Sequence, residues 1–196
     1  MKEENPWQQL YQSIEKCENC SLGAGCLHKV PGQGDLHAPL MIIGEGPGQQ
    51  EDEQGLAFVG PAGRLLTRML QAIALPRERV YICNVVKCRP PHNRQPLPEE
   101  MRACLPHLRR QFLLARPQVL LLLGATAVSA ILGPEYRITR CHGQWVSRKG
   151  VDIIATYHPA ALLRDASKKR AAWQDLQALR ARLEEKNLYG DLLKET

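Results

Sequence analysis

Four short apolar runs recur along the chain. They occupy residues 40–44, 80–85, 119–123 and 151–156, and each consists mainly of large or branched apolar side chains. Continuous apolar runs of this length are typical of strands buried on both faces. Segments with helical character separate them, so the pattern predicts an α/β fold with a parallel sheet and helices on both faces.

Five segments are expected to be helices. They are residues 5–16, 62–75, 99–115, 125–132 and 168–187. Pro76 ends the second of them, and Pro106 is tolerated in the third only near its first turns or at a kink. In the last helix, Trp173 and three leucines are expected to face the core, while residues 136–147 are expected to be irregular or a hairpin. The 196 residues are expected to form one domain, with segment 5–39 packed on it.

Polar residues follow three of the four predicted strands. Residues 44–52 read Gly-Glu-Gly-Pro-Gly-Gln-Gln-Glu-Asp, Asn84 ends the second strand, and His158 follows the fourth. Ligands of parallel sheets bind beyond the carboxyl ends of the strands, so this edge is the candidate site. Pro47 interrupts a dinucleotide fingerprint in the glycine loop, and no helix opens directly from it. Three carboxylates there would repel phosphate, which favours the floor of a pocket for a neutral base that becomes anionic.

The chain is basic, with a net charge of +6 and an isoelectric point of about 9.0. This excess indicates a polyanionic partner, nucleic acid before an anionic membrane. The proline-rich loop 87–98 carries Lys87, Arg89 and Arg94, and with Arg164 these are expected to hold DNA phosphates. No signal peptide or apolar run of membrane-spanning length is present, which predicts a cytoplasmic, nucleoid-associated protein without a membrane partner.

Seven cysteines in a chain without an export signal suggest metal ligation or buried thiols before disulfides. Cys17 and Cys20 form a C-x2-C pair, and Cys88 and Cys104 bracket the proline loop and the start of a helix. Four thiolates in this pattern suit an iron-sulfur cluster or a tetrahedral zinc ion, which the ligands alone do not separate. Cys26 is an alternative ligand.

Each remaining candidate has a structural alternative. Asn84 offers the donors and the acceptor that read a base edge, or it is a satisfied residue at a strand end. Phe58 stacks on a base or fills the core. His158 is catalytic or only a structural hydrogen-bonding group. The apolar residues after it form a wedge that unstacks DNA, or Leu162 and Leu163 begin the core face of the last helix.

Several motifs together resemble the family 4 uracil-DNA glycosylases, in the right order from about residue 10 to 180. They are Gly-Glu-Gly-Pro-Gly at 44–48 with Glu51 and Asp52, Phe-Val-Gly at 58–60, Asn-Val-Val-Lys-Cys-Arg-Pro at 84–90 with Asn93 and Arg94, and His-Pro-Ala-Ala-Leu-Leu-Arg at 158–164. The resemblance implies a three-layer α/β/α sandwich around a four-stranded parallel sheet. It also implies hydrolysis of the N-glycosidic bond of uracil in single- or double-stranded DNA.

The resemblance assigns roles to individual residues. Gly44, Glu45, Gly46, Pro47 and Gly48 line the pocket, Glu51 crowds the C5 position of the base, Phe58 stacks on uracil, Asn84 reads its polar edge, and His158 lies by O2. Leu162 matches the DNA-intercalating position. The cysteines Cys17, Cys20, Cys88 and Cys104 match the ligands of a [4Fe-4S] cluster, which is expected to pin the N-terminal helix to the proline loop.

One departure concerns the residue that activates water. Gly46 stands where the best-known branch of the superfamily has an aspartate, an absence that family 4 shares, so Glu45 is expected to take the acidic role with His158 as its catalytic partner. His92 lies in the loop where a covalent-trapping relative uses a histidine, and here it is expected on the phosphate side.

Two other classes of function compete with the glycosylase. One is a non-catalytic iron-sulfur domain that binds DNA in association with a polymerase, and the other is a nucleotide-dependent oxidoreductase that uses the glycine loop and the cluster. The protein is expected to act as a monomer, and contact with a sliding clamp is an open possibility.

Overall fold

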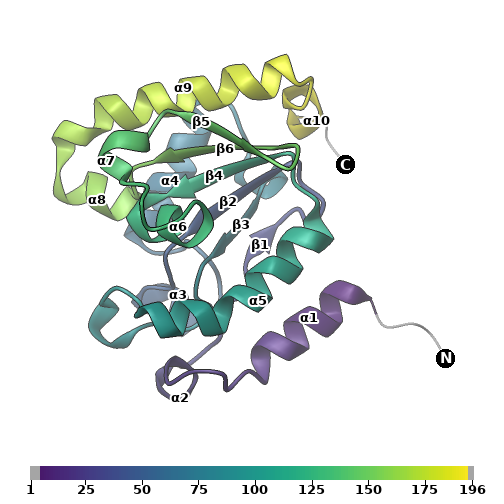
Figure 1. The fold of residues 1–196 in the computed structure, drawn as a ribbon, viewed down its shortest axis with the longest axis vertical. Coiled ribbons are helices and arrows are strands. Elements are labelled where there is room, and N and C mark those ends of the chain that lie inside the picture. The colour runs from purple at the N-terminus through teal and green to yellow at the C-terminus, as the bar shows by residue number, and fades with distance from the viewer. Residues whose placement is uncertain (1–4, 194–196) are drawn as a thin grey trace.

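One sheet runs through the computed structural model, which describes residues 5–193 (Figure 1). Its strands are β1 (Gln33–Gly34), β2 (Leu40–Gly44), β3 (Tyr81–Asn84), β4 (Val119–Leu123), β5 (Trp145–Arg148) and β6 (Val151–Thr156), in the order β1-β3-β2-β4-β6-β5. The central strands β3, β2, β4 and β6 are mutually parallel, and the edge strands β1 and β5 pair antiparallel. The predicted α/β class and parallel centre are therefore confirmed.

The expectation of a four-stranded sheet was wrong, because the sheet has six strands. Both additional strands lie at the edges, where one side of the backbone lacks a partner and side chains reach solvent. β1 has no apolar residue, and only Trp145 and Val146 of β5 are apolar and partly buried. Neither strand therefore produces the continuous apolar run by which the four central strands were predicted.

The helices surround this sheet. They are α1 (Pro6–Glu15), α2 (Leu22–Gly25), α3 (Gln49–Gln54), α4 (Pro61–Ala72), α5 (Pro98–Ala115), α6 (Gly124–Ile131), α7 (Ile138–Cys141), α8 (Pro159–Arg164), α9 (Lys169–Glu185) and α10 (Tyr189–Leu193), with short 3-10 turns at Arg77–Arg79, Pro91–Asn93 and Ala166–Lys168. All five predicted helices are present with small shifts of their ends. The expectation that no helix opens directly from the glycine loop was wrong, because α3 begins there with Gly48 as its N-cap residue. The helix was not predicted because its sequence Gln-Gln-Glu-Asp-Glu-Gln has no apolar stripe.

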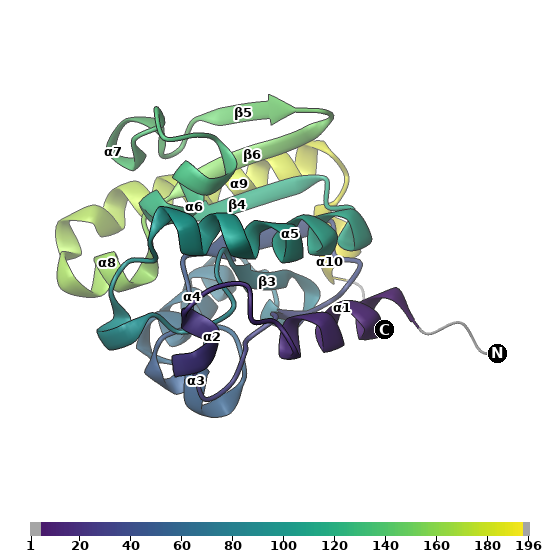
Figure 2. The ribbon, with the colours of Figure 1, turned by 60° about the horizontal axis from the view of Figure 1, so that its bottom comes forward.

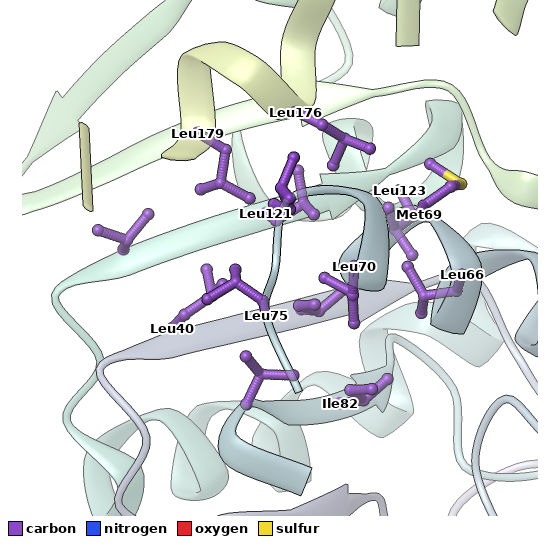
Figure 3. Packing of buried hydrophobic residues seen from close by; sticks show 14 of the residues in the cluster. Leu40, Leu66, Met69, Leu70, Leu75, Ile82, Leu121, Leu123, Leu176 and Leu179 are labelled. Atoms are coloured by element: carbon purple, nitrogen blue, oxygen red, sulfur yellow. The ribbon is translucent and has the colours of Figure 1, made fainter. Parts of the chain in front are cut away.

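Two hydrophobic layers hold the sheet between helices. Figure 3 shows one layer, in which Leu40 and Leu121 of the strands meet leucines of α4 and α9. The neighbouring residues Met41 and Leu120 point to the other face and pack with α1, α5 and α6. Figure 2 shows α1 and α5 on the side of the sheet opposite α9. Alternate residues of each strand thus fill opposite layers, as a strand buried on both faces requires.

The prediction was wrong for one residue of the expected core. Trp173 of α9 is 41% exposed, whereas Leu176, Leu179 and Leu183 are buried as expected. Within residues 5–193, no helix is long and apolar enough to cross a membrane.

The parallel register brings the ends of the central strands together. Gly44 pairs with Asn84, and Leu123 pairs with Thr156, so the residues that follow these strands emerge at one edge of the sheet. The hydrogen bonds from the Val85 amide to the Gly44 carbonyl (3.0 Å) and from the Val86 amide to the Glu45 carbonyl (3.1 Å) continue the β2–β3 pairing into the loops. The backbone at this edge is therefore fixed by sheet hydrogen bonds.

Candidate active site

A cavity of about 580 Å³ opens at the carboxyl ends of the central strands. It is lined by residues that include Glu45, Gly46, Pro47, Gly48, Glu51, Phe58, Asn84, Arg94, Tyr157, His158, Arg164 and Lys168. The structure therefore brings together every predicted catalytic and substrate-binding residue except Gly44, which lies directly beneath. The volume is within the range of small-molecule sites, roughly 300–1,000 Å³.

Gly44 has no room for a side chain. A Cβ at this position would lie 2.5 Å from Asn84 Oδ1 and 2.5 Å from Phe58 Cζ. The glycine therefore lets the amide and the aromatic ring pack against the backbone of β2. Asn84 is 1% exposed, and among residues 5–193 no group donates to its Oδ1. A buried acceptor without a partner costs free energy, so this atom is available to a ligand that donates a hydrogen bond.

The Phe58 turn is held by charged side chains on both sides. Glu51 Oε1 accepts hydrogen bonds from the amides of Val59 (2.8 Å) and Gly60 (2.7 Å). Arg77 donates to the carbonyls of Ala57 and Phe58, both at 2.9 Å. Phe58 adopts a left-handed conformation with φ of 54°, which is unfavourable for a non-glycine residue. The turn is therefore fixed from outside. Phe58 belongs to the core and also lines the cavity, and its stacking on a base stays a prediction.

His158 is the N-cap residue of α8, and its Nδ1 accepts a hydrogen bond from the Ala160 amide at 3.1 Å. Burial, and secondarily the positive charge of Arg164, lower the pKa of His158 to about 4. The imidazole is therefore neutral near pH 7, and because Nδ1 is an acceptor, the proton resides on Nε2. The site thus contains an N–H donor that is fixed by the helix cap. The Phe58 ring lies beside it, with centroids 5.8 Å apart.

Glu45 is oriented by a residue that the sequence analysis missed. The hydroxyl of Thr126 in α6 donates to Glu45 Oε2, and Thr126 is 9% exposed. α6 begins directly after β4, so the rule that marks the ends of strands also applies there. No polar residue ends β4 itself. For this reason the sequence did not indicate that the end of β4 contributes to the site.

Two of the predicted phosphate contacts are placed differently from the expectation. Lys87 is 1% exposed, and its Nζ donates to the carbonyl of Asn84 at 2.6 Å, so its assignment to the DNA surface was wrong. Arg94 lines the cavity but forms a bidentate ion pair with buried Glu100, with contacts of 2.6 and 2.8 Å. Arg89 is half-buried, and Arg164 is exposed at the end of α8.

Leu162 does not lie where a DNA-intercalating residue must. It is 2% exposed and packs in the core with α4 and α9, although it belongs to the separate helix α8 and does not begin the last helix. Leu163 is 49% exposed. Successive residues of a helix point about 100° apart, so a shift of one position exchanges the buried face of α8 for the exposed one.

The four predicted cysteine ligands line one small cavity. Cys17, Cys20, Cys88 and Cys104 line a space of about 10 Å³ together with Lys87 and His107. The thiols of Cys88 and Cys104 have pKa values raised above the ordinary range, mainly by burial, and the Lys87 charge partly offsets this at Cys104. Among residues 5–193, no three His, Cys, Asp or Glu side chains stand close enough to hold a single metal ion.

Comparison with known proteins agrees with this architecture. A family model described as the uracil DNA glycosylase superfamily matches residues 31–177, and the chain belongs to that superfamily. The chain is similar to the type-4 uracil-DNA glycosylase of Thermotoga maritima, with 42% identity over 85% of this chain and 88% of the relative. It is also similar to those of Archaeoglobus fulgidus (42%; 79% and 81%) and Pyrobaculum aerophilum (38%; 86% and 90%). The resemblance to family 4 is confirmed.

Proposed function

We propose that this protein is a uracil-DNA glycosylase that hydrolyses the N-glycosidic bond of uracil in DNA and leaves an abasic site. The observation that carries the proposal is the combination in one cavity of an unpaired acceptor on Asn84, the Phe58 ring and the fixed Nε2–H of His158. These groups match a planar base that donates at one edge and collects negative charge on an oxygen. The superfamily membership and the similarity to type-4 enzymes support the same function.

Binding begins when the nucleotide leaves the helical stack. Flipping costs a few kcal/mol, which base contacts in the pocket offset. Phe58 offers a ring face for stacking, and the Asn84 amide pairs with the uracil edge, where Oδ1 accepts from N3–H and Nδ2 donates to O4. Glu51 lines the same cavity, and its Oε1 holds the Phe58 turn. We assign it the C5 side of the base, where the methyl group of thymine would clash.

Bond cleavage moves charge from the sugar to the base. As the C–N bond lengthens, the sugar becomes oxocarbenium-like and uracil O2 gains negative charge. The His158 Nε2–H donates to that oxygen, and its contribution is larger in the transition state than in the ground state because the charge is then larger. The Glu45 carboxylate stabilises the sugar cation or orients the attacking water, and Thr126 fixes its direction.

We propose that Cys17, Cys20, Cys88 and Cys104, which line one small cavity, hold an iron-sulfur cluster. Buried Lys87 forms no ion pair with a carboxylate among the described residues, and an anionic cluster would supply the missing negative charge. The resemblance of these four cysteines to the ligands of the family 4 cluster is the support for [4Fe-4S] over zinc. When bound, the cluster would cross-link the 17–20 segment, the proline loop and α5, and no redox step is needed for hydrolysis.

DNA enters along the rim of the cavity. Arg164 and Lys168 line the cavity, Arg89 precedes the lining residue Pro90, and we assign exposed Leu163 to the gap that the flipped base leaves. We propose that the protein acts as a monomer on nucleoid DNA in the cytoplasm, since one chain supplies every group used in the reaction. In this proposal, a contact with a sliding clamp would serve only to recruit the protein to DNA.

The test is release of uracil from a labelled oligonucleotide that contains one uracil. Purified protein is expected to produce alkali-labile abasic sites, and Asn84→Ala is expected to bind DNA but to release uracil at least tenfold more slowly. Intact strands at excess enzyme, together with salt-sensitive DNA binding, would instead support a non-catalytic DNA-binding domain. Iron and sulfide content with a visible charge-transfer band tests the cluster, and a colourless zinc-loaded protein would overturn that assignment.

A further inference from the structure

A second large hollow lies on the α5 face of the sheet. This groove has a volume of about 1110 Å³, larger than a typical small-molecule pocket of roughly 300–1,000 Å³. We call it the α5 groove, and its apolar lining consists of Ile43, Leu105, Pro106, Leu108, Phe112, Leu113, Pro117, Leu120, Ile131, Val151 and Ile153. Strands β2, β4 and β6 form its floor and α5 forms one wall. Leu113, which also lines the groove, is 58% exposed.

The charges around the α5 groove have one sign. Its lining includes Arg102, Arg109, Arg116, Arg148 and Lys149, all exposed, and no acidic residue. Within residues 5–193, none of these five cations forms an ion pair with a carboxylate. In the part of the chain that the structure describes, Arg148 donates to the carbonyls of Ile131 and Leu132, and its guanidinium lies 5.7 Å from the centroid of the Tyr136 ring. An apolar floor surrounded by cations without carboxylate partners suits a ligand that supplies both carboxylates and large apolar side chains.

The α5 groove is separate from the catalytic cavity. Val151 begins β6, and Arg116 and Pro117 precede β4, so these lining residues lie at the amino ends of central strands. The catalytic cavity lies at the carboxyl ends. Figure 1 shows the β5–β6 turn and the C-terminal end of α5 at one end of the sheet, and α7 and α8 at the other. A molecule in the α5 groove therefore does not block access of DNA to the site.

We propose that the α5 groove binds an acidic amphipathic segment of another protein, with large apolar residues flanked by Asp and Glu. Nucleic acid fits less well, because phosphates do not use an apolar floor and Phe112 is the only aromatic side chain that lines the groove. A second copy of this chain would bring the same five cations against the first set, and a flat membrane surface does not fill a concave groove. Apolar contacts supply affinity, and the surrounding cations supply orientation and association rate.

The experiment measures fluorescence anisotropy of two labelled probe peptides, which place Phe and Leu between Asp and Glu, one in an alternating and one in a helical pattern. The double variant R109E/R116E is expected to bind the better peptide at least tenfold more weakly, and L113S to weaken it as well. Arg110→Glu is the matched control, since Arg110 is the neighbouring exposed cation on α5 but does not line the groove. All variants are expected to release uracil at the wild-type rate.

Three results would overturn the proposal. The first is that neither peptide binds more tightly than its counterpart with Lys in place of Asp and Glu. The second is that R109E/R116E loses no more than twice the binding free energy that Arg110→Glu loses, which indicates general charge attraction. The third is competition by duplex DNA or by phosphatidylglycerol vesicles as effective as competition by unlabelled peptide, which assigns the groove to nucleic acid or to membrane. Circular dichroism of each variant excludes unfolding as the cause of lost binding.

Discussion

Replacing His158 by asparagine separates two functions of one imidazole. Nδ1 caps α8 by accepting from the Ala160 amide, and the proposed mechanism uses the Nε2–H of this cavity-lining residue as a donor to the substrate. Asparagine is among the best N-cap residues, so His158→Asn retains an acceptor for that amide but removes the Nε2–H donor. His158→Ala removes both functions and is expected to cost about 1 kcal/mol more in unfolding free energy, which urea denaturation measures.

The expected catalytic loss follows from the charge on the leaving base. Removing one donor from a developing anion costs about 10²–10³ in rate, roughly 3–4 kcal/mol. Single-turnover release of uracil should therefore slow by that factor in both variants, although only the alanine variant loses the helix cap. An asparagine variant with more than about a tenth of the wild-type rate would refute the role of Nε2–H.

The pH dependence of stability and of the excision rate gives a second test of His158. Because the pKa of His158 is about 4 in the folded protein and near 6.5 in the unfolded chain, the unfolded state binds more protons between these values. Stability therefore decreases as the pH falls through this window, by roughly 3 kcal/mol from this residue alone, and His158→Asn should flatten that part of the profile. A wild-type excision rate that falls above about pH 6.5 would show that imidazolium is the active form and would contradict this account.

Other expectations follow from contacts in the site. Gly44→Ala introduces a Cβ against Asn84 Oδ1, and single-turnover assays should show a rate loss of about 10²-fold, because a small displacement of a positioned group has that effect. Thr126→Val keeps the shape of the side chain but frees Glu45; the rate should fall about tenfold with little change in melting temperature, and Thr126→Ser should restore it. Cys88→Ser should abolish the visible absorption of the purified protein and lower its melting temperature, whereas retention of a full iron complement would remove Cys88 from the ligand set.

The centre of the fold was predictable because four buried strands leave continuous apolar runs in the sequence. The edge strands left no such run, since β1 has only Gln33 and Gly34. In the site, Asn84 and His158 were identified because the carboxyl ends of parallel strands meet at one edge. Lys87 was assigned wrongly because burial of a lysine depends on what packs over it, and no local pattern distinguishes Lys87 from Arg89.

The wrong expectation that Leu162 is exposed and intercalates into DNA has a related cause. Both leucines belong to a short helix that was not predicted, and only the direction of that helix relative to α4 and α9 decides which of them is buried. Arg77, which holds the Phe58 turn, likewise had no sequence signal, because its contacts reach residues 19 and 20 positions away. Long-range packing therefore determines the roles of these residues.

The order of the strands also has a consequence for synthesis of the protein. β2 lies between β3 and β4, and β4 lies between β2 and β6, so a chain that ends after α5 has an unpaired β2 edge and lacks His158. Non-local pairing of this kind forms late and leaves open edges until it is complete. Prematurely terminated products are therefore expected to be unable to excise bases from the genome and to expose a strand edge by which quality-control proteases and chaperones can recognise them.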